Sequence, residues 1–173
     1  RVDRLVLNTA GGSQADPEVM KRIITLSMAA AENPTWDTVQ ARIKWLMADK
    51  SKDYDDIVAS RQRVYRQPGF VDAMRDIMAL QDPEIRARNL LGPEEYGAIA
   101  APTLVLWTSD DPTADVSEGR RISEMIPGAR FEVMPDCGHC ACAQPTGSRM
   151  PTATTAPTSS SPGSRRMTSH SSL

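Results

Sequence analysis

The sequence predicts an α/β fold in which a helical segment is inserted between two parts of a mainly parallel sheet. Three observations support this prediction. A short apolar run, Leu5-Val6-Leu7, precedes two glycines; a long stretch with helical periodicity runs from about Pro17 to Leu91; and a strand–helix–strand pattern occupies residues 103–134. Alternating strands and helices are typical of open parallel sheets.

The first strand is expected at Leu5-Val6-Leu7. This run is apolar throughout and is bounded by polar residues and by Gly11-Gly12. Such a run is typical of a buried strand in a parallel sheet, although periodicity alone does not exclude a helix.

Four amphipathic helices are expected next, with no strand between them. The apolar stripes of the first two are Val19, Ile23, Leu26 and Ala30, and then Trp36, Val39, Ile43 and Leu46. Thr35 is a candidate N-cap for the second helix. The third helix is expected from about Asp53 to Tyr65, and the fourth contains Phe70, Met74, Ile77 and Met78.

The strand and helix alternation returns after this segment. Thr103–Trp107 is rich in strand formers, and a polar turn from Thr108 to Asp115 follows it. A helix is expected from about Ser117 to Ile126, and Phe131–Met134 then alternates like a strand. This strand leads into a loop that ends at His139.

The composition changes abruptly after this loop. From Ala141 to Leu173 there is no Asp, Glu, Val, Ile, Phe, Tyr or Trp, and Ser, Thr and Pro dominate. We expect a disordered tail, because such a stretch buries too little apolar surface to offset its ordering entropy. The predicted organisation is a core strand in residues 1–12, a helical cap in 13–97, a strand–helix–strand core in 98–140 and the tail in 141–173.

Composition and charge exclude several classes of protein. The net charge is −2 and the Lys and Arg residues are scattered, which argues against a nucleic-acid partner. No apolar run approaches the ~20 residues that cross a bilayer, and no secretory signal is visible, so a cytoplasmic location is expected. The three cysteines fall between Cys137 and Cys142, a crowding that predicts reduced thiols rather than a disulfide framework. A homo-oligomer is compatible with the sequence.

Two polar loops carry the chemistry that we predict. Asp110-Asp111 follows the strand at 103–107, and His139 follows the strand at 131–134. Functional groups in open α/β sheets gather at the carboxyl ends of the strands, so these loops are expected to meet. A carboxylate bonded to an imidazole fixes its tautomer and makes it a general base near neutral pH. Alone, either residue is more commonly an ordinary turn or surface residue; the joint placement favours a catalytic pair.

These motifs resemble a known family. Ala101–Thr113 resembles the acid-bearing region of the α/β-hydrolases, and within that superfamily it is most similar to the meta-cleavage product hydrolases, which break a carbon–carbon bond in ring-opened aromatic compounds. Asp136–His139 resembles their histidine loop, and Arg1–Leu7 is similar to the strand after their nucleophile-bearing helix. The four-helix stretch resembles their lid. The resemblance covers about Arg1 to His139 and implies a partial α/β-hydrolase fold.

The resemblance also implies roles for three residues. Asp111, rather than Asp110, matches the family's acid, and His139 matches its histidine. Arg61 lies within an apolar helical stripe, where its guanidinium either extends to water or points under the lid to hold a substrate oxygen anion. Ala59-Ser60-Arg61 resembles the lid arginine that contacts substrate in carbon–carbon hydrolases, which favours the second interpretation.

The sequence also departs from the family pattern. It contains no Gly-x-Ser-x-Gly elbow, so the nucleophile is missing, and so is the segment of the oxyanion hole. Cys140 and the Ser/Thr/Pro tail stand where the family has a tryptophan and a final helix. We hypothesise an out-of-frame tail and a truncated front. Resequencing the codons for residues 137–145 tests this, since one clean frame would refute it.

The predicted function is therefore that of a fragment of a serine-type α/β-hydrolase acting on a carbon–carbon bond of a dienoic ketoacid from aromatic degradation. It needs a small carbonyl or carboxylate substrate and no cofactor or metal. The alternatives are an ester or epoxide hydrolase, or a fragment without activity. A zinc module of Cys137, His139, Cys140 and Cys142 is disfavoured, because ligands this close together cannot easily surround one ion. A helical interaction protein built on residues 17–91 is a further alternative.

Overall fold

The computed structural model describes residues 2–139. The predicted disordered tail (141–173) and Cys140 lie outside the described residues. The elements are, in order, β1 (Leu5–Asn8), α1 (Pro17–Glu32), α2 (Trp36–Leu46), α3 (Asp55–Tyr65), α4 (Phe70–Met78), the short 3₁₀ helix η1 (Ala79–Gln81), α5 (Pro83–Arg88), α6 (Pro93–Gly97), β2 (Thr103–Thr108), α7 (Val116–Met125) and β3 (Arg130–Met134).

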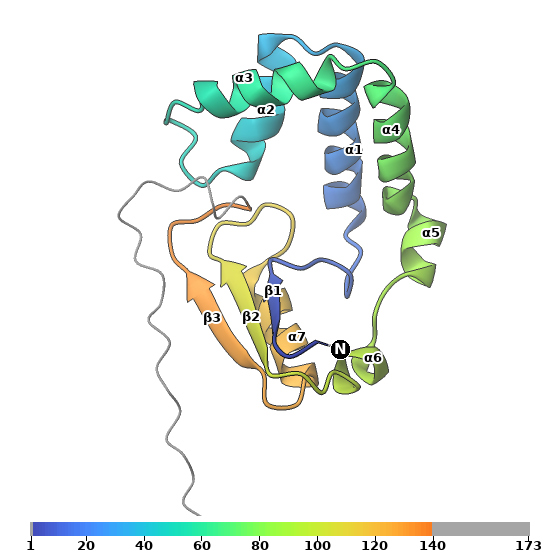
Figure 1. The fold of residues 1–173 in the computed structure, drawn as a ribbon, viewed down its shortest axis with the longest axis vertical. Helices are drawn as coiled ribbons and strands as arrows, with labels where there is room; N and C mark the ends of the chain where they lie inside the picture. Colours follow the sequence, from blue (N-terminus) through green and yellow to red (C-terminus); the bar gives the residue numbers. More distant parts are fainter. Residues whose placement is uncertain (1, 140–173) are drawn as a thin grey trace, which may run out of the picture.

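The three strands form one parallel sheet, as the sequence predicts, and their order in it is β1-β2-β3. Leu7 pairs with Val105, and Trp107 pairs with Val133. The connection from β1 to β2 contains the helices α1 to α6, whereas β2 and β3 are joined through α7 alone. The carboxyl ends of the strands point toward α1–α4, so the loops after the strands lie between the sheet and these helices (Figure 1).

One face of the sheet packs against α7. Trp107, Ile122 and Ile126 are almost fully buried between β2 and this helix. Gly119 allows the close approach, because a Cβ there would lie 2.9 Å from Cγ of the Trp107 ring. The indole N–H of Trp107 donates to the carbonyl oxygen of Ala114 at 3.1 Å, which fixes the loop after β2 to the strand that precedes it.

The helices α1 to α4 share a second core. Its buried members include Ala30, Val39, Ile43, Val58 and Tyr65. The starts of α1 and α2 are fixed by side chains of the preceding residues. Asp16 accepts from the amides of Glu18 and Val19, and Thr35 accepts from that of Thr38, as predicted for an N-cap.

Some expectations about burial are wrong. Val6 is 59% exposed, because burial alternates along β1 and Val6 points to the face of the sheet opposite to that of Leu7, which packs against the core between β2 and α7. Trp36 and Ile77, placed in apolar stripes by their spacing, are 37% and 52% exposed, because each lies at an end of its helix. Two short helices, α5 and α6, were not predicted separately; each begins with a proline at its first turn, a position that proline favours.

Candidate active site

The acid loop begins directly after β2. Asp111 lies three residues beyond Thr108, and its side chain is fully buried. Its Oδ1 accepts two hydrogen bonds from Thr113, one from the backbone N–H at 2.8 Å and one from the hydroxyl at 2.7 Å. Aspartate commonly folds back in this way onto the residue two positions later. The short loop therefore orients its own carboxylate.

The histidine loop follows β3 and is joined to the acid loop by backbone hydrogen bonds. The amide of Ser109 donates to the carbonyl of Met134 at 3.0 Å, and that of Asp110 donates to Cys137 at 2.8 Å. Asp136 has a φ of 54°, a left-handed conformation that aspartate tolerates better than most residues. These contacts extend the pairing of β2 and β3 beyond the sheet, so the two loops run together.

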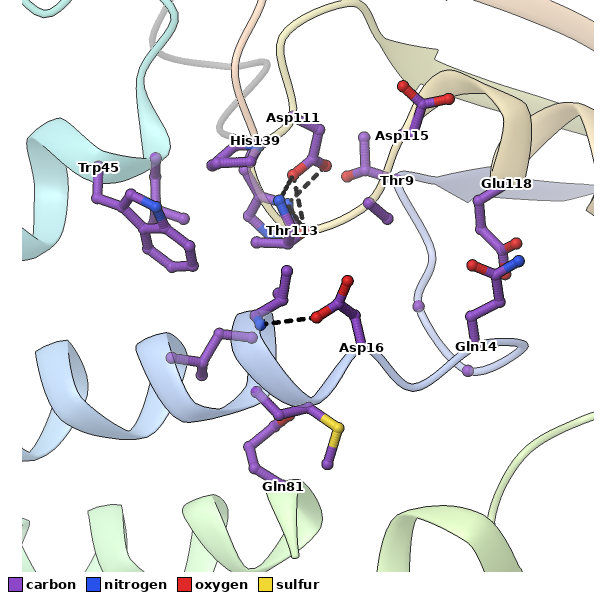
Figure 2. A pocket seen from close by; sticks show the side chains of 18 of the residues that line it. Thr9, Gln14, Asp16, Trp45, Gln81, Asp111, Thr113, Asp115, Glu118 and His139 are labelled. Carbon is purple, nitrogen blue, oxygen red and sulfur yellow. Dashed lines mark hydrogen bonds and ion pairs between the residues drawn. The ribbon is translucent and has the colours of Figure 1, made fainter. Parts of the chain in front are cut away.

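The two loops bring His139 onto Asp111. Nδ1 of His139 lies 2.9 Å from Oδ2 of Asp111, and the Thr113 hydroxyl oxygen lies 3.2 Å from the same nitrogen (Figure 2). Since Asp111 is held as a carboxylate and the Thr113 hydroxyl donates to it, Nδ1–H of His139 is the donor toward Asp111. Nε2 of the neutral imidazole is then the nitrogen that can accept a proton.

Opposing effects act on the charge of Asp111. Burial alone would raise the pKa of this carboxyl, but the hydrogen bonds from His139 and from the Thr113 hydroxyl and amide favour the charged form and lower the pKa below its usual value. The carboxylate is therefore ionised at neutral pH, as required of a group that stabilises an imidazolium.

A cavity of about 490 Å³ opens beside this pair. Asp111, Thr113 and His139 form one wall, and in Figure 2 Trp45 lies across from His139 with Asp16 and Gln81 at the opposite side. The rest of the lining comes from the loop after β1, from α1, α2 and α5, and from the start of α7, and includes Thr9, Gly11, Gly12, Gln14, Met20, Ile23, Arg42, Leu46, Arg86, Asp115 and Glu118. The acid–histidine pair thus faces a space between the sheet and the helices.

The predicted site residues are not all at this cavity. Asp111 and His139 are brought together, whereas Asp110 is exposed and bonds to the hydroxyl of Ser109. Arg61 lies on α3, is exposed, and does not line the cavity. Arg42 on α2 does line it, and its Nε donates to Oγ of Ser27 at 3.1 Å.

The sequence interpretation missed Thr113. Its hydroxyl contacts both members of the pair, yet in the sequence it is one more polar residue in a polar turn. The available signal was its position two residues after Asp111, where the backbone N–H commonly donates to an aspartate side chain.

Two further features of residues 2–139 concern potential metal ligands and the cysteine thiol. No group of three or more potential metal ligands occurs in this part of the chain. Cys137 is fully buried; burial, together with the nearby carboxylates of Asp136 and Asp110, raises the pKa of its thiol. The thiol is therefore protonated at neutral pH, and a protonated thiol is a poor nucleophile. None of the helices in this range is long and apolar enough to cross a membrane.

Comparison with known proteins identifies the family. Residues 3–147 match the alpha/beta hydrolase family, and the chain belongs to it. A 2-hydroxy-6-oxononadienedioate/2-hydroxy-6-oxononatrienedioate hydrolase of Paraburkholderia xenovorans (strain LB400) is 31% identical over 146 residues, which are 82% of this chain and 48% of that protein. A 2-hydroxy-6-oxo-6-phenylhexa-2,4-dienoate hydrolase of Comamonas testosteroni is 27% identical, over 82% of this chain and 49% of that protein.

Solved structures agree with this fold. The meta-cleavage product hydrolase from Pseudomonas fluorescens IP01 superimposes with a TM-score of 0.63 at 23% identity, covering 80% of this chain and 49% of that structure. The predicted resemblance to meta-cleavage product hydrolases is confirmed, and the chain corresponds to part of an α/β-hydrolase. It spans about half the length of the curated relatives it matches.

Proposed function

We propose that this chain supplies the acid and the histidine of a serine-type hydrolase. The observation that carries the proposal is the contact of 2.9 Å between His139 Nδ1 and a buried carboxylate of Asp111, at the wall of a cavity. The side chain of His139 is 36% exposed, so its ring is accessible from that cavity while its partner is not.

The chemistry follows from the pairing of an accessible imidazole with a buried carboxylate. His139 takes the proton of an attacking hydroxyl at Nε2 and later returns it to the leaving group, while Asp111 stabilises the intervening imidazolium. Water then completes the hydrolysis by the same route. In this proposal the nucleophile is a serine that these 173 residues do not supply, since they contain no Gly-x-Ser-x-Gly elbow.

The substrate class that we propose is a ring-cleavage product with a 2-hydroxy-6-oxo-dienoate skeleton, in which a carbon–carbon bond is hydrolysed. The support is the similarity to two curated hydrolases whose names contain such substrates. An ester is the second candidate, since the acid–histidine pair does not select the bond that breaks.

The test uses a joined enzyme, in which this chain replaces the matching part of the Paraburkholderia relative and the rest of that relative is kept. We expect it to hydrolyse 2-hydroxy-6-oxononadienedioate, and we expect the variant His139→Gln to lose that activity. Faster turnover of p-nitrophenyl acetate than of the dienedioate would favour the ester alternative. Equal activity of the joined enzyme and its His139→Gln variant on both substrates would contradict the proposal.

The arginine that holds an acidic substrate is a separate part of the proposal. We propose Arg61 from the family resemblance, while Arg42 is the arginine of α2 that lines the same cavity as His139. In the joined enzyme, Arg61→Ala should slow turnover of the dienedioate far more than that of a neutral ester, and Arg42→Ala serves as the matched comparison. Equal losses on both substrates after Arg61→Ala would count against its role.

A further inference from the structure

We propose that the helical region positions the catalytic histidine, through a hydrogen bond between the end of α2 and the backbone of His139 that only a glycine at position 138 permits. The inference rests on the proposed function, since it assigns a purpose to the placement of His139. It makes Gly138 and the carbonyl of Leu46 positioning groups rather than catalytic ones.

The hydrogen bond joins segments far apart in the chain. The backbone N–H of His139 donates to the carbonyl oxygen of Leu46, the last residue of α2, at 2.8 Å. In Figure 1 the segment after β3 rises from the sheet toward α2. His139 thus has two anchors: its ring is bonded to the acid loop, and its backbone is bonded to the helical region.

The α2 end requires this partner. The last carbonyls of a helix have no partner within it and must find donors elsewhere. The carbonyl oxygen of Lys44 accepts from the backbone N–H of Met47, and that of Met47 accepts from the ammonium of Lys50. The donor for the carbonyl oxygen of Leu46 comes from the histidine loop. Leu46 and Met47 are buried, which makes an unsatisfied carbonyl here costly.

Gly138 is the residue that makes this approach possible. A Cβ at this position would overlap the carbonyl oxygen of Leu46 and would lie 2.6 Å from the amide nitrogen of Ala48 and 2.8 Å from the carbonyl carbon of Met47. All three atoms belong to the backbone, which cannot rotate away as a side chain could. Any larger residue would push the loop from α2 and would move His139 with it.

One consequence concerns motion. If α2 moves away from the sheet, His139 loses its backbone anchor and is held only by the short loop and by Asp111. The histidine is therefore fully positioned only when α2 is seated over the cavity.

The experiment compares three glycine variants by amide hydrogen exchange of the 173-residue chain. In Gly138→Ala we expect the His139 amide to exchange roughly tenfold faster relative to the amides of β2 and β3. The pKa of the Asp111 carboxyl should rise toward its usual value, because the ring that bonds to it has moved.

Two matched variants separate positioning from general destabilisation. Gly119→Ala forces a methyl group against the Trp107 ring and should loosen the core, but it should leave the His139 amide protected in proportion to β2 and β3. Gly97→Ala has room for its methyl group, whose nearest neighbour is the Met125 carbonyl oxygen at 3.9 Å, and should change nothing. Unchanged protection of His139 in Gly138→Ala would overturn the inference.

A measurement on the unaltered chain keeps the inference testable if Gly138→Ala does not fold. Amide hydrogen exchange is measured at a series of urea concentrations below the unfolding transition. The His139 amide should become exchangeable at the same urea concentrations as the last amides of α2. Opening together with β3 instead would overturn the inference. Absence of the His139–Asp111 bond from the unaltered chain would contradict the proposed function itself, whereas a bond present but insensitive to position 138 would contradict this inference alone.

Discussion

The acid loop and the histidine loop are supported in different ways. The contacts that orient Asp111 come from Thr113, within the same turn, and from the ring of His139. The histidine loop depends on two regions, since Cys137 accepts from the acid loop while the amide of His139 donates to α2. The acid is thus placed by local chemistry, and the histidine by the way the sheet and helices are assembled.

This difference in support matches the different requirements of the acid and of the histidine. The buried carboxylate needs a fixed position and a negative charge. The tight turn provides the position, and the two hydrogen bonds from Thr113 and the one from His139 favour the charged form. An imidazole that exchanges protons with substrate must stay accessible, so it cannot be enclosed in the same way. Backbone anchoring at His139 holds the residue while leaving Nε2 open to the cavity.

The largest expected effect comes from the acid. In the joined enzyme, Asp111→Asn should reduce kcat by about 10³- to 10⁴-fold, because the amide no longer stabilises the imidazolium and favours the wrong tautomer. Asp110→Asn is the matched control, since Asp110 is exposed and bonds only to Ser109 within the described contacts of its side chain. Similar kcat values for the two variants in a steady-state assay would contradict the assignment of Asp111, rather than Asp110, as the catalytic acid.

The next effect concerns pH. The carboxyl of Asp111 has a lowered pKa in the folded chain, so it binds protons more weakly there than in the unfolded chain. Its contribution to stability is complete above the ordinary aspartate pKa of about 3.9 and is lost as the pH falls through the folded value. Urea unfolding at several pH values should show a steeper acid loss for the unaltered chain than for Asp111→Asn. Parallel curves would contradict the lowered pKa.

A smaller effect is expected from Thr113, which tests how far the acid loop supports itself. Thr113→Val removes the hydroxyl that bonds to both Asp111 and His139, and should lower the free energy of unfolding by about 1–2 kcal/mol. Thr113→Ser keeps the hydroxyl and should lose less. Urea titration of both variants provides the comparison, and a greater loss for Ser than for Val would show that packing of the methyl group dominates.

The smallest effect tests which part of α2 matters to the histidine. Thr35 caps the start of α2, at the opposite end from Leu46. Thr35→Ala should lower the free energy of unfolding by about 1 kcal/mol, the usual cost of a lost N-cap. Hydrogen exchange should show His139 no less protected, relative to β3, than in the unaltered chain. Selective loss of His139 protection would mean that the whole helix, not its end, supports the histidine loop.

The sequence predicts one half of this arrangement better than the other. The strands, α7 and the proximity of Asp111 to His139 follow from local patterns, because alternating strands and helices place successive loops at one edge of a parallel sheet. Even Thr113 was accessible from its spacing to Asp111. The contact of Gly138 with the end of α2 was not, because it joins residues about ninety positions apart and depends on how two packed layers meet. The exposure of Arg61 depends on the same assembly.

The most direct test of the account is the imidazole of His139 itself. The sequence has two histidines, so His170→Gln leaves His139 alone in a ¹⁵N-resolved NMR spectrum of the imidazole. At neutral pH we predict that the proton resides on Nδ1, with a hydrogen-bonded signal that disappears in Asp111→Asn. A proton on Nε2, or a spectrum unchanged by Asp111→Asn, would contradict the acid–histidine pair on which the proposed function depends.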